Sequence, residues 1–196
     1  MKERPIIFSA EMVQAILYER KTQTRRVVKE QPNRVRYNNI VMSGKYGWED
    51  EHGRRLLNLY GAPGDRLWVR ESWQRCPHCG RLDYKSSDER FQCRSCNEEL
   101  GKWKSPMFMF REYSRVTLEI TDVRVERLQD ISESDAIAEG APLWIPKSDY
   151  LKQYCDGSYR NGFHELWNSI NAKRGYPWSS NPFVWVIEFK RLESDA

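Results

Sequence analysis

The chain has 196 residues, of which 31% are charged, and a formal net charge of +4. This length favours one domain with a sizeable core and leaves room for an inserted module. No apolar run approaches the roughly 20 residues needed to cross a bilayer, and the first residues lack the apolar stretch of a secretory signal. We therefore expect a cytoplasmic protein with no membrane partner.

Positive charge is concentrated near the N-terminus. Residues 1–36 hold nine Lys/Arg and four Asp/Glu, whereas the remainder holds 23 and 24. This asymmetry favours an anionic partner such as RNA or a nucleotide. The eight Trp and ten Tyr could stack on bases, although each of them could equally fill the core.

The chain begins with a predicted strand and a short amphipathic helix. Residues 6–8 form an apolar run, and Ser9 is a good helix N-cap. Apolar residues then recur with helical spacing as far as Leu17, which predicts a helix of about two turns.

A cluster of cations and hydroxyls follows this helix directly: Arg20, Lys21, Thr22, Thr24, Arg25 and Arg26. Threonine favours extended backbone, so the chain should leave the helix and become a strand here. Alternation would place Thr24 and Lys21 on opposite faces, unless a twist at the helix exit brings them to one cleft. A basic surface strand is the simpler interpretation.

The middle of the chain is irregular and then becomes strand-like. Residues 29–60 predict a long loop with a hairpin between 41 and 59, and a turn at 63–65 precedes a strand at 66–71. The alternation of residues 114–120 changes phase before Val123, which predicts a β-bulge. Curved strands of this kind suit a small barrel.

Two pairs of cysteines lie between these strands: Cys76, Cys79, Cys93 and Cys96. Two residues separate the members of each pair, and thirteen residues separate the pairs. This spacing predicts a closed four-thiolate site for structural zinc, and the polar segment between the pairs would need the metal in place of a core. Disulfides are the alternative, His78 could replace one thiolate, and Cys155 remains as a free thiol.

The last third of the chain predicts two helices and a buried strand. Ser132 should cap a helix that Gly140 ends, which leaves Glu139 in a last turn where the helix dipole disfavours a carboxylate. Residues 163–170 are amphipathic, and residues 183–189 are apolar on both faces of a strand.

The order of elements and several motifs resemble the ASCH domains of the PUA-like superfamily, most closely the phage and prophage versions. The residues that carry the resemblance are Glu19-Arg-Lys-Thr-Gln-Thr-Arg25, Gly64-Asp-Arg-Leu-Trp-Val-Arg-Glu71 and Val184-Trp-Val-Ile-Glu-Phe189, together with 4–9 and 132–140. The resemblance implies an α+β fold: a small mixed β-barrel with flanking helices over 1–196, here with a zinc-ribbon-like insert at 73–104.

The resemblance also implies a cleft for RNA or a nucleoside. One branch of the superfamily is similar to amidohydrolases that remove the acetyl group of N(4)-acetylcytidine, and the positions matching its catalytic set are Lys21, Thr24 and Glu139. Arg20, Arg25 and Arg26 would then contact nucleic acid. Where the family usually has glycine, this chain has Glu19.

Two divisions of labour among the catalytic set are chemically reasonable. Lys21, its pKa lowered in a cationic pocket, could activate the Thr24 hydroxyl as a nucleophile while Glu139 orients it. Alternatively, Glu139 activates water and Lys21 stabilises the oxyanion. A non-catalytic RNA-binding regulator and an RNA nuclease are the competing hypotheses for the whole protein.

Overall fold

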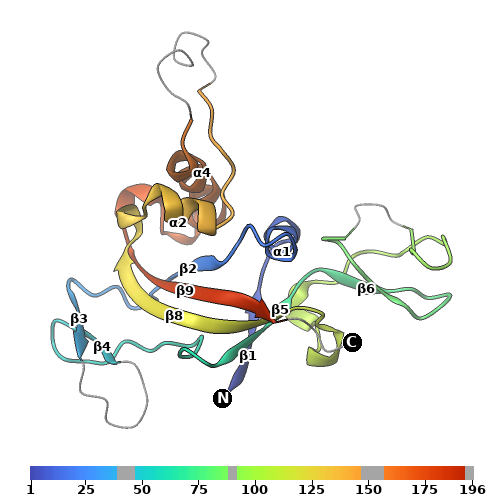
Figure 1. The fold of residues 1–196 in the computed structure, drawn as a ribbon, viewed down its shortest axis with the longest axis horizontal. Coiled ribbons are helices and arrows are strands. Elements are labelled where there is room, and N and C mark those ends of the chain that lie inside the picture. The colour runs from blue at the N-terminus through green and yellow to red at the C-terminus, as the bar shows by residue number, and fades with distance from the viewer. Residues whose placement is uncertain (39–46, 88–91, 147–156, 193–196) are drawn as a thin grey trace.

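A computed structural model describes residues 1–196 except 39–46, 88–91, 147–156 and 193–196. Its centre is a five-stranded sheet in the order β1-β5-β8-β9-β2 (Figure 1). The strands are β1 (Glu3–Ile7), β2 (Gln23–Val27), β5 (Arg66–Arg70), β8 (Thr117–Arg127) and β9 (Phe183–Leu192). β1 pairs with β5 in parallel, and the other neighbours are antiparallel. The α+β class and the mixed sheet are therefore confirmed.

The predicted barrel is not closed, because no backbone pairing joins the edge strands β1 and β2 in the described residues. Side chains occupy the place where such pairing would close the sheet. Arg26 of β2 donates from Nη2 to the carbonyl of Ile7 in β1 at 2.7 Å. The same guanidinium lies over the Phe8 ring, 5.2 Å from its centroid.

Helices cover both faces of the sheet, and β9 supplies alternate residues to the two cores. Trp185, Ile187 and Phe189 belong to the core that contains α1 (Ala10–Leu17). Val184 and Val186 belong to the core with α2 (Glu133–Ala138) and α4 (Tyr159–Asn171), which lie together in Figure 1. β9 is thus apolar on both faces, as predicted. The described helices include none that is both long and apolar enough to span a bilayer.

Several local predictions are confirmed. Ser9 caps α1, and Ser132 caps α2 in a reciprocal capping box with Asp135. The register of β8 against β9 shifts between Ile120 and Asp122, which is the expected bulge. Short 3-10 helices connect the elements: η1 (Pro106–Phe108), η2 (Arg111–Tyr113), η3 (Leu128–Asp130), η4 (Ala172–Arg174) and η5 (Trp178–Ser180).

The hairpin of the irregular region lies earlier than predicted. Its strands are β3 (Val35–Asn38) and β4 (Gly47–Asp50), whereas the prediction placed the hairpin within 41–59. The cross-strand rings of Tyr37 and Trp48, 5.0 Å apart, hold the pair together. The surrounding asparagines and glycines hid this short β pattern in the sequence.

The cysteine-rich segment projects from the sheet between β5 and β8 (Figure 1). It contains the two-stranded sheet of β6 (Trp73–Arg75) and β7 (Leu82–Tyr84). Its ends meet, since Trp73 and Lys104 exchange backbone hydrogen bonds at 3.3 and 2.8 Å. We propose that residues 73–104 are an insert in a single domain, and this closed neck supports that proposal.

Candidate active site and candidate metal centre

The exit of α1 determines where Lys21 lies. Glu19 adopts a left-handed conformation with φ of 58°, and the amides of Arg20 and Lys21 both donate to the carbonyl of Ala15 at 2.8 and 3.0 Å. Glycine is the residue that this conformation favours, which gives a physical reason for glycine at this position in the family that the motif resembles. The tight exit turns the Lys21 side chain inward.

Lys21 packs against the end of α2. A Cβ added to Gly140, whose φ is +72°, would lie 3.2 Å from the Cβ atoms of Lys21 and Ala15. The amide of Thr22 also donates to the carbonyl of Ala138 at 2.8 Å. Glycine at position 140 therefore allows the two segments to come together, and a larger residue there would push them apart.

The Lys21 ammonium is buried and fully hydrogen-bonded. The residue is only 2% exposed, and Nζ donates to the carbonyls of Gln23 and Glu139 at 2.8 Å each and to Glu139 Oε2 at 2.6 Å. These acceptors use all three N–H bonds. Burial lowers the pKa of Lys21, and the Glu139 carboxylate opposes this effect. In this geometry Lys21 has no donor left for a ligand.

Glu139 is the C-cap of α2 and is 5% exposed. Its second carboxylate oxygen, Oε1, accepts from Arg25 Nη1 at 3.3 Å. The carboxylate lies at the C-terminal end of α2, where the helix dipole disfavours negative charge, and two buried cations offset this effect. The carboxylate is held rigidly between Lys21 and Arg25.

Arg25 belongs to a wider network of charges and does not face solvent. Its side chain is 0% exposed, with Nη2 2.6 Å from Glu126 Oε1 and 3.4 Å from Asp135 Oδ2. Nη1 also donates to Gln23 Oε1 at 2.6 Å. These partners leave Arg25 unavailable to a phosphate in this structure.

A cavity of about 260 Å³ lies between β2 and α4, and we call it the Thr24 cavity. Thr24, Arg26 and Glu139 line it, whereas Lys21 does not. No hydrogen bond of the Thr24 hydroxyl is present among the described residues. The rest of the lining consists of Met12, Arg25, Val27, Lys29, Tyr60, Phe163, Leu166, Trp167, Ile170, Asn171, Arg174 and Tyr176.

The structure therefore brings the three predicted catalytic residues together in two layers. Thr24 and Glu139 border the cavity, and Lys21 lies behind Glu139 and contacts it directly. Lys21 and Thr24 thus do not share one cleft, and Glu139 is the residue that contacts Lys21 and also lines the Thr24 cavity.

The other two predicted cations differ from Arg25. Arg26 lines the Thr24 cavity, and its Nε is buried with no hydrogen-bond partner in the described part of the chain. Arg20 is exposed and lines neither this cavity nor the larger one described below. Arg26 is thus the member of the trio that is placed to meet a ligand in the Thr24 cavity.

Sequence reasoning missed most of the aromatic lining. Four aromatic residues line this cavity: Tyr60, Phe163, Trp167 and Tyr176. In the sequence, Tyr60 falls in a predicted loop, and Phe163 and Trp167 fit the buried face of a predicted helix. The signal in the sequence that could have indicated this lining is its high aromatic content, because a cavity for a planar ligand needs aromatic rings as well as charges. No local pattern separates these rings from ordinary core.

Asp135 gives this charge network a testable dependence on pH. Burial alone raises the pKa of Asp135, but hydrogen bonds from Ser132 and Gln23 and the charge of Arg25 lower it below the ordinary 3.8. A lowered carboxyl pKa stabilises the fold above the unfolded value, and this stability is lost as pH falls through the folded value.

We therefore expect the free energy of unfolding to fall below about pH 4, and to fall less steeply in Asp135→Asn. Urea titrations monitored by tryptophan fluorescence between about pH 5 and pH 2 would measure both slopes. Asp130→Asn, at an exposed position without an ion pair in the described chain, is the matched control. Parallel curves for wild type and Asp135→Asn would refute this role.

The four cysteines converge on one point in the insert. Their Sγ atoms all lie within 4.8 Å of one another, with Cys76 and Cys96 3.6 Å apart and Cys79 and Cys93 3.5 Å apart. A tetrahedron with Zn–S bonds of about 2.3 Å has sulfur separations of about 3.8 Å. The four are free thiols, and His78 is exposed outside the cluster. Cys155 lies outside the described residues.

The two cysteine pairs adopt the same turn, which orients the thiols. Gly80 and Asn97 each donate their amide to the carbonyl of the first cysteine of their pair, at 3.0 and 2.8 Å. Both residues have positive φ, of 74° and 60°. Two matching knuckles are the arrangement that a closed four-thiolate site needs, so the donor set fits a tetrahedral metal such as zinc. Structural zinc here remains a proposal.

Ser86 of the insert also contacts an ion pair that lies beside the insert, at the end of the sheet. Glu71, at the end of β5 and 1% exposed, accepts from Arg115 Nε at 2.9 Å and from the Ser86 hydroxyl. Gln14 of α1 donates to the Ser86 carbonyl at 2.9 Å. Ser86 therefore connects the insert to α1 and to the end of β5.

Comparison with known proteins gives one structural similarity. No family model and no curated protein matches the chain. The crystal structure of the ASCH domain from Lactobacillus crispatus JV V101 is similar over 97% of this chain and 79% of that chain, with a TM-score of 0.42 and 12% sequence identity. At that level of similarity, proposals about this chain depend on its own motifs and side-chain geometry.

Proposed function

We propose that this protein binds an N(4)-acylated cytidine in the Thr24 cavity and hydrolyses its amide bond. The observation that carries the proposal is that Thr24, whose hydroxyl has no hydrogen bond in the described residues, lines the same cavity as Glu139, whose carboxylate is held by Lys21 and Arg25. The resemblance of the Glu19–Arg25 motif to acetylcytidine amidohydrolases supports the same chemistry.

The cavity has the size and lining for a small planar ligand. Its volume of about 260 Å³ is close to the lower end of the roughly 300–1,000 Å³ typical of small-molecule sites. Tyr60 and Tyr176, which are partly exposed, supply aromatic groups on which a pyrimidine ring can stack. The acyl group would then lie beside Thr24.

The proposed reaction gives each residue a role in acyl transfer. Thr24 Oγ1 attacks the acyl carbonyl carbon while its proton passes to the Glu139 carboxylate. The C–N bond breaks, and the exocyclic nitrogen leaves with the proton from Glu139 as the amino group of cytidine. Water then hydrolyses the threonyl ester and releases the carboxylic acid.

Two cations support this reaction from different positions. Arg26 supplies a buried Nε–H without an acceptor, suited to the oxyanion that develops on the acyl oxygen. Lys21 acts through Glu139, which it orients, and is thus a positioning residue in this scheme. Of the two divisions of labour considered from the sequence, this scheme keeps Thr24 as nucleophile and makes Glu139 its base.

Thr24→Val is expected to lower kcat for N(4)-acetylcytidine at least about 10³-fold, because valine keeps the shape of threonine without the hydroxyl. Chromatographic measurement of cytidine release would check this. Thr22→Val is the matched control, because Thr22 is exposed and does not line the Thr24 cavity. Wild-type turnover by Thr24→Val, or no cytidine release by the wild type, would contradict the proposal.

A further inference from the structure

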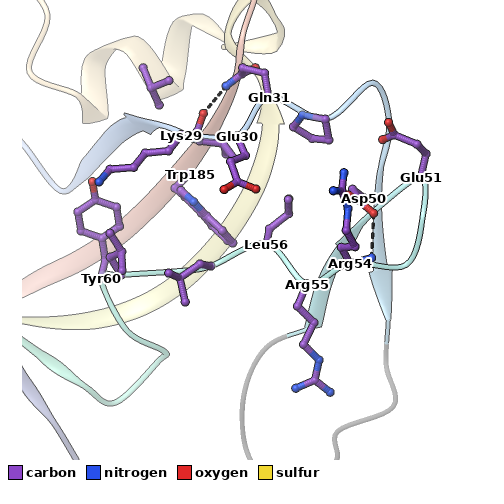
Figure 2. Close-up of a pocket in the computed structure, with 15 residues that line it drawn as sticks. Lys29, Glu30, Gln31, Asp50, Glu51, Arg54, Arg55, Leu56, Tyr60 and Trp185 are labelled. Atoms are coloured by element: carbon purple, nitrogen blue, oxygen red, sulfur yellow. Dashed lines mark hydrogen bonds and ion pairs between the residues drawn. The ribbon is translucent and has the colours of Figure 1, made fainter.

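The described residues also form a larger cavity, which the proposed reaction does not use. It has a volume of about 510 Å³ and lies beside the β3–β4 hairpin, so we call it the hairpin cavity (Figure 2). Segments 27–32 and 50–60 supply most of its lining, and Trp185 of β9 contributes from the sheet. Its size is well within the range of small-molecule sites.

The hairpin cavity adjoins the Thr24 cavity. Val27, Lys29 and Tyr60 line both of them. In Figure 2 the Lys29 side chain extends toward the Tyr60 ring, so these two residues form the boundary between the cavities. Tyr60 and Arg26 both line the Thr24 cavity, and the charge of Arg26 opposes the rise that burial causes in the pKa of Tyr60. A ligand longer than one nucleoside could therefore occupy both cavities.

The combined surface has an excess of positive charge. Four cations on it have no carboxylate partner in the described chain: Arg26, Lys29, Arg55 and Arg174. The acids of the hairpin cavity are mostly engaged, since Asp50 accepts from Arg54 Nε at 2.7 Å and Glu51 from Asn33 Nδ2 at 2.9 Å. Among the lining acids, Glu30 alone forms no hydrogen bond or ion pair in the described residues, although its charge acts on Arg54. The charge left over suits a phosphodiester.

The hairpin cavity also offers apolar surface for a base. Leu56 and Trp185, which pack in the same core, line the cavity together with Leu57, which is 76% exposed (Figure 2). A nucleotide has a base that stacks on apolar surface and a phosphate that attracts cations, so it matches both the apolar lining and the cations without an ion pair.

We propose that the hairpin cavity binds the nucleotide joined to the acylated cytidine, so that the preferred substrate is a single RNA strand and not the free nucleoside. This inference rests on the proposed function of the Thr24 cavity. The phosphodiester would cross the boundary at Lys29 and Tyr60, with Arg55 beside the neighbouring nucleotide.

The test compares N(4)-acetylcytidine with a short single-stranded oligoribonucleotide that contains one such residue. We expect the wild type to have about tenfold or higher kcat/KM for the oligonucleotide, and Arg55→Glu to lower this preference about tenfold. Arg36→Glu is the matched control, because Arg36 is exposed on the same hairpin but lines neither cavity. It should retain the wild-type preference.

A binding assay separates this inference from the proposed reaction. Fluorescence anisotropy with a labelled, unmodified oligoribonucleotide should show binding that weakens with salt and that Arg55→Glu weakens about tenfold. If neither acylated substrate is hydrolysed but this binding result holds, the proposed reaction fails and the hairpin cavity stands as an RNA site. The inference would be overturned if the wild type turned over both substrates with equal kcat/KM and if Arg55→Glu and Arg36→Glu bound the oligoribonucleotide with the same affinity.

Discussion

Glu139→Leu is expected to lower the free energy of unfolding by about 3–5 kcal/mol. The change removes the carboxylate that contacts Lys21 at 2.6 Å and Arg25 at 3.3 Å, and Lys21 would then remain charged in a buried site. Chemical denaturation monitored by tryptophan fluorescence measures the effect. Glu112→Leu, at an exposed position, is the control and should change stability by no more than about 0.5 kcal/mol.

A double variant separates the structural role of this pair from its chemical role. Lys21→Met with Glu139→Leu replaces both charges by apolar groups, so most of the lost stability should return. The rate of cytidine release from N(4)-acetylcytidine should stay about 10²–10⁴-fold below that of the wild type, because the double variant still lacks the base. If Glu139→Leu costs less than about 1 kcal/mol, the buried pair is not a structural element. If the double variant turns over at the wild-type rate, Glu139 is not the base.

Loss of metal from the insert should have the second large effect. We expect about one zinc ion per purified chain, held with a binding free energy of roughly 10–16 kcal/mol that also folds the insert. Cys93→Ser, or removal of zinc by a strong chelator, should expose residues 73–104 to protease while the main sheet stays folded. The sheet has its own cores, to which the cysteines do not belong.

Metal analysis and limited proteolysis would measure this prediction, and Cys155→Ser is the control because Cys155 belongs to neither of the two closely spaced cysteine pairs in the sequence. A cobalt-substituted protein should show the absorption of tetrahedral thiolate coordination. Zinc content that is normal in Cys93→Ser, or a chelated insert that resists protease as well as the untreated protein does, would contradict a structural metal site.

The sequence predicted those parts of the fold that depend on neighbouring residues. Ser9 and Ser132 cap helices because their hydroxyls meet amides within the next turn, and the bulge in β8 follows from a change of phase within one strand. Glu139 was a useful signal because its position opposed the helix dipole. Its compensation comes from Lys21, 118 positions away.

Contacts between segments that are far apart in the sequence could not be predicted from neighbouring residues. In the open sheet, Arg26 of β2 donates to the carbonyl of Ile7 in β1, and no local pattern in the sequence shows which side chain links two edge strands. The burial of Arg25 likewise depends on acids from β8 and α2. Both cavities gather their lining from segments that only the tertiary fold brings together.

The most direct test of the proposed site is a search for the acylated form of Thr24. Wild-type protein would be mixed with N(4)-acetylcytidine, quenched during turnover and analysed by peptide mass spectrometry. The proposal predicts an acetyl group on Thr24 that appears together with free cytidine and is absent from Thr24→Val. Release of cytidine without any acetylated Thr24, at a rate that Thr24→Val shares, would contradict it.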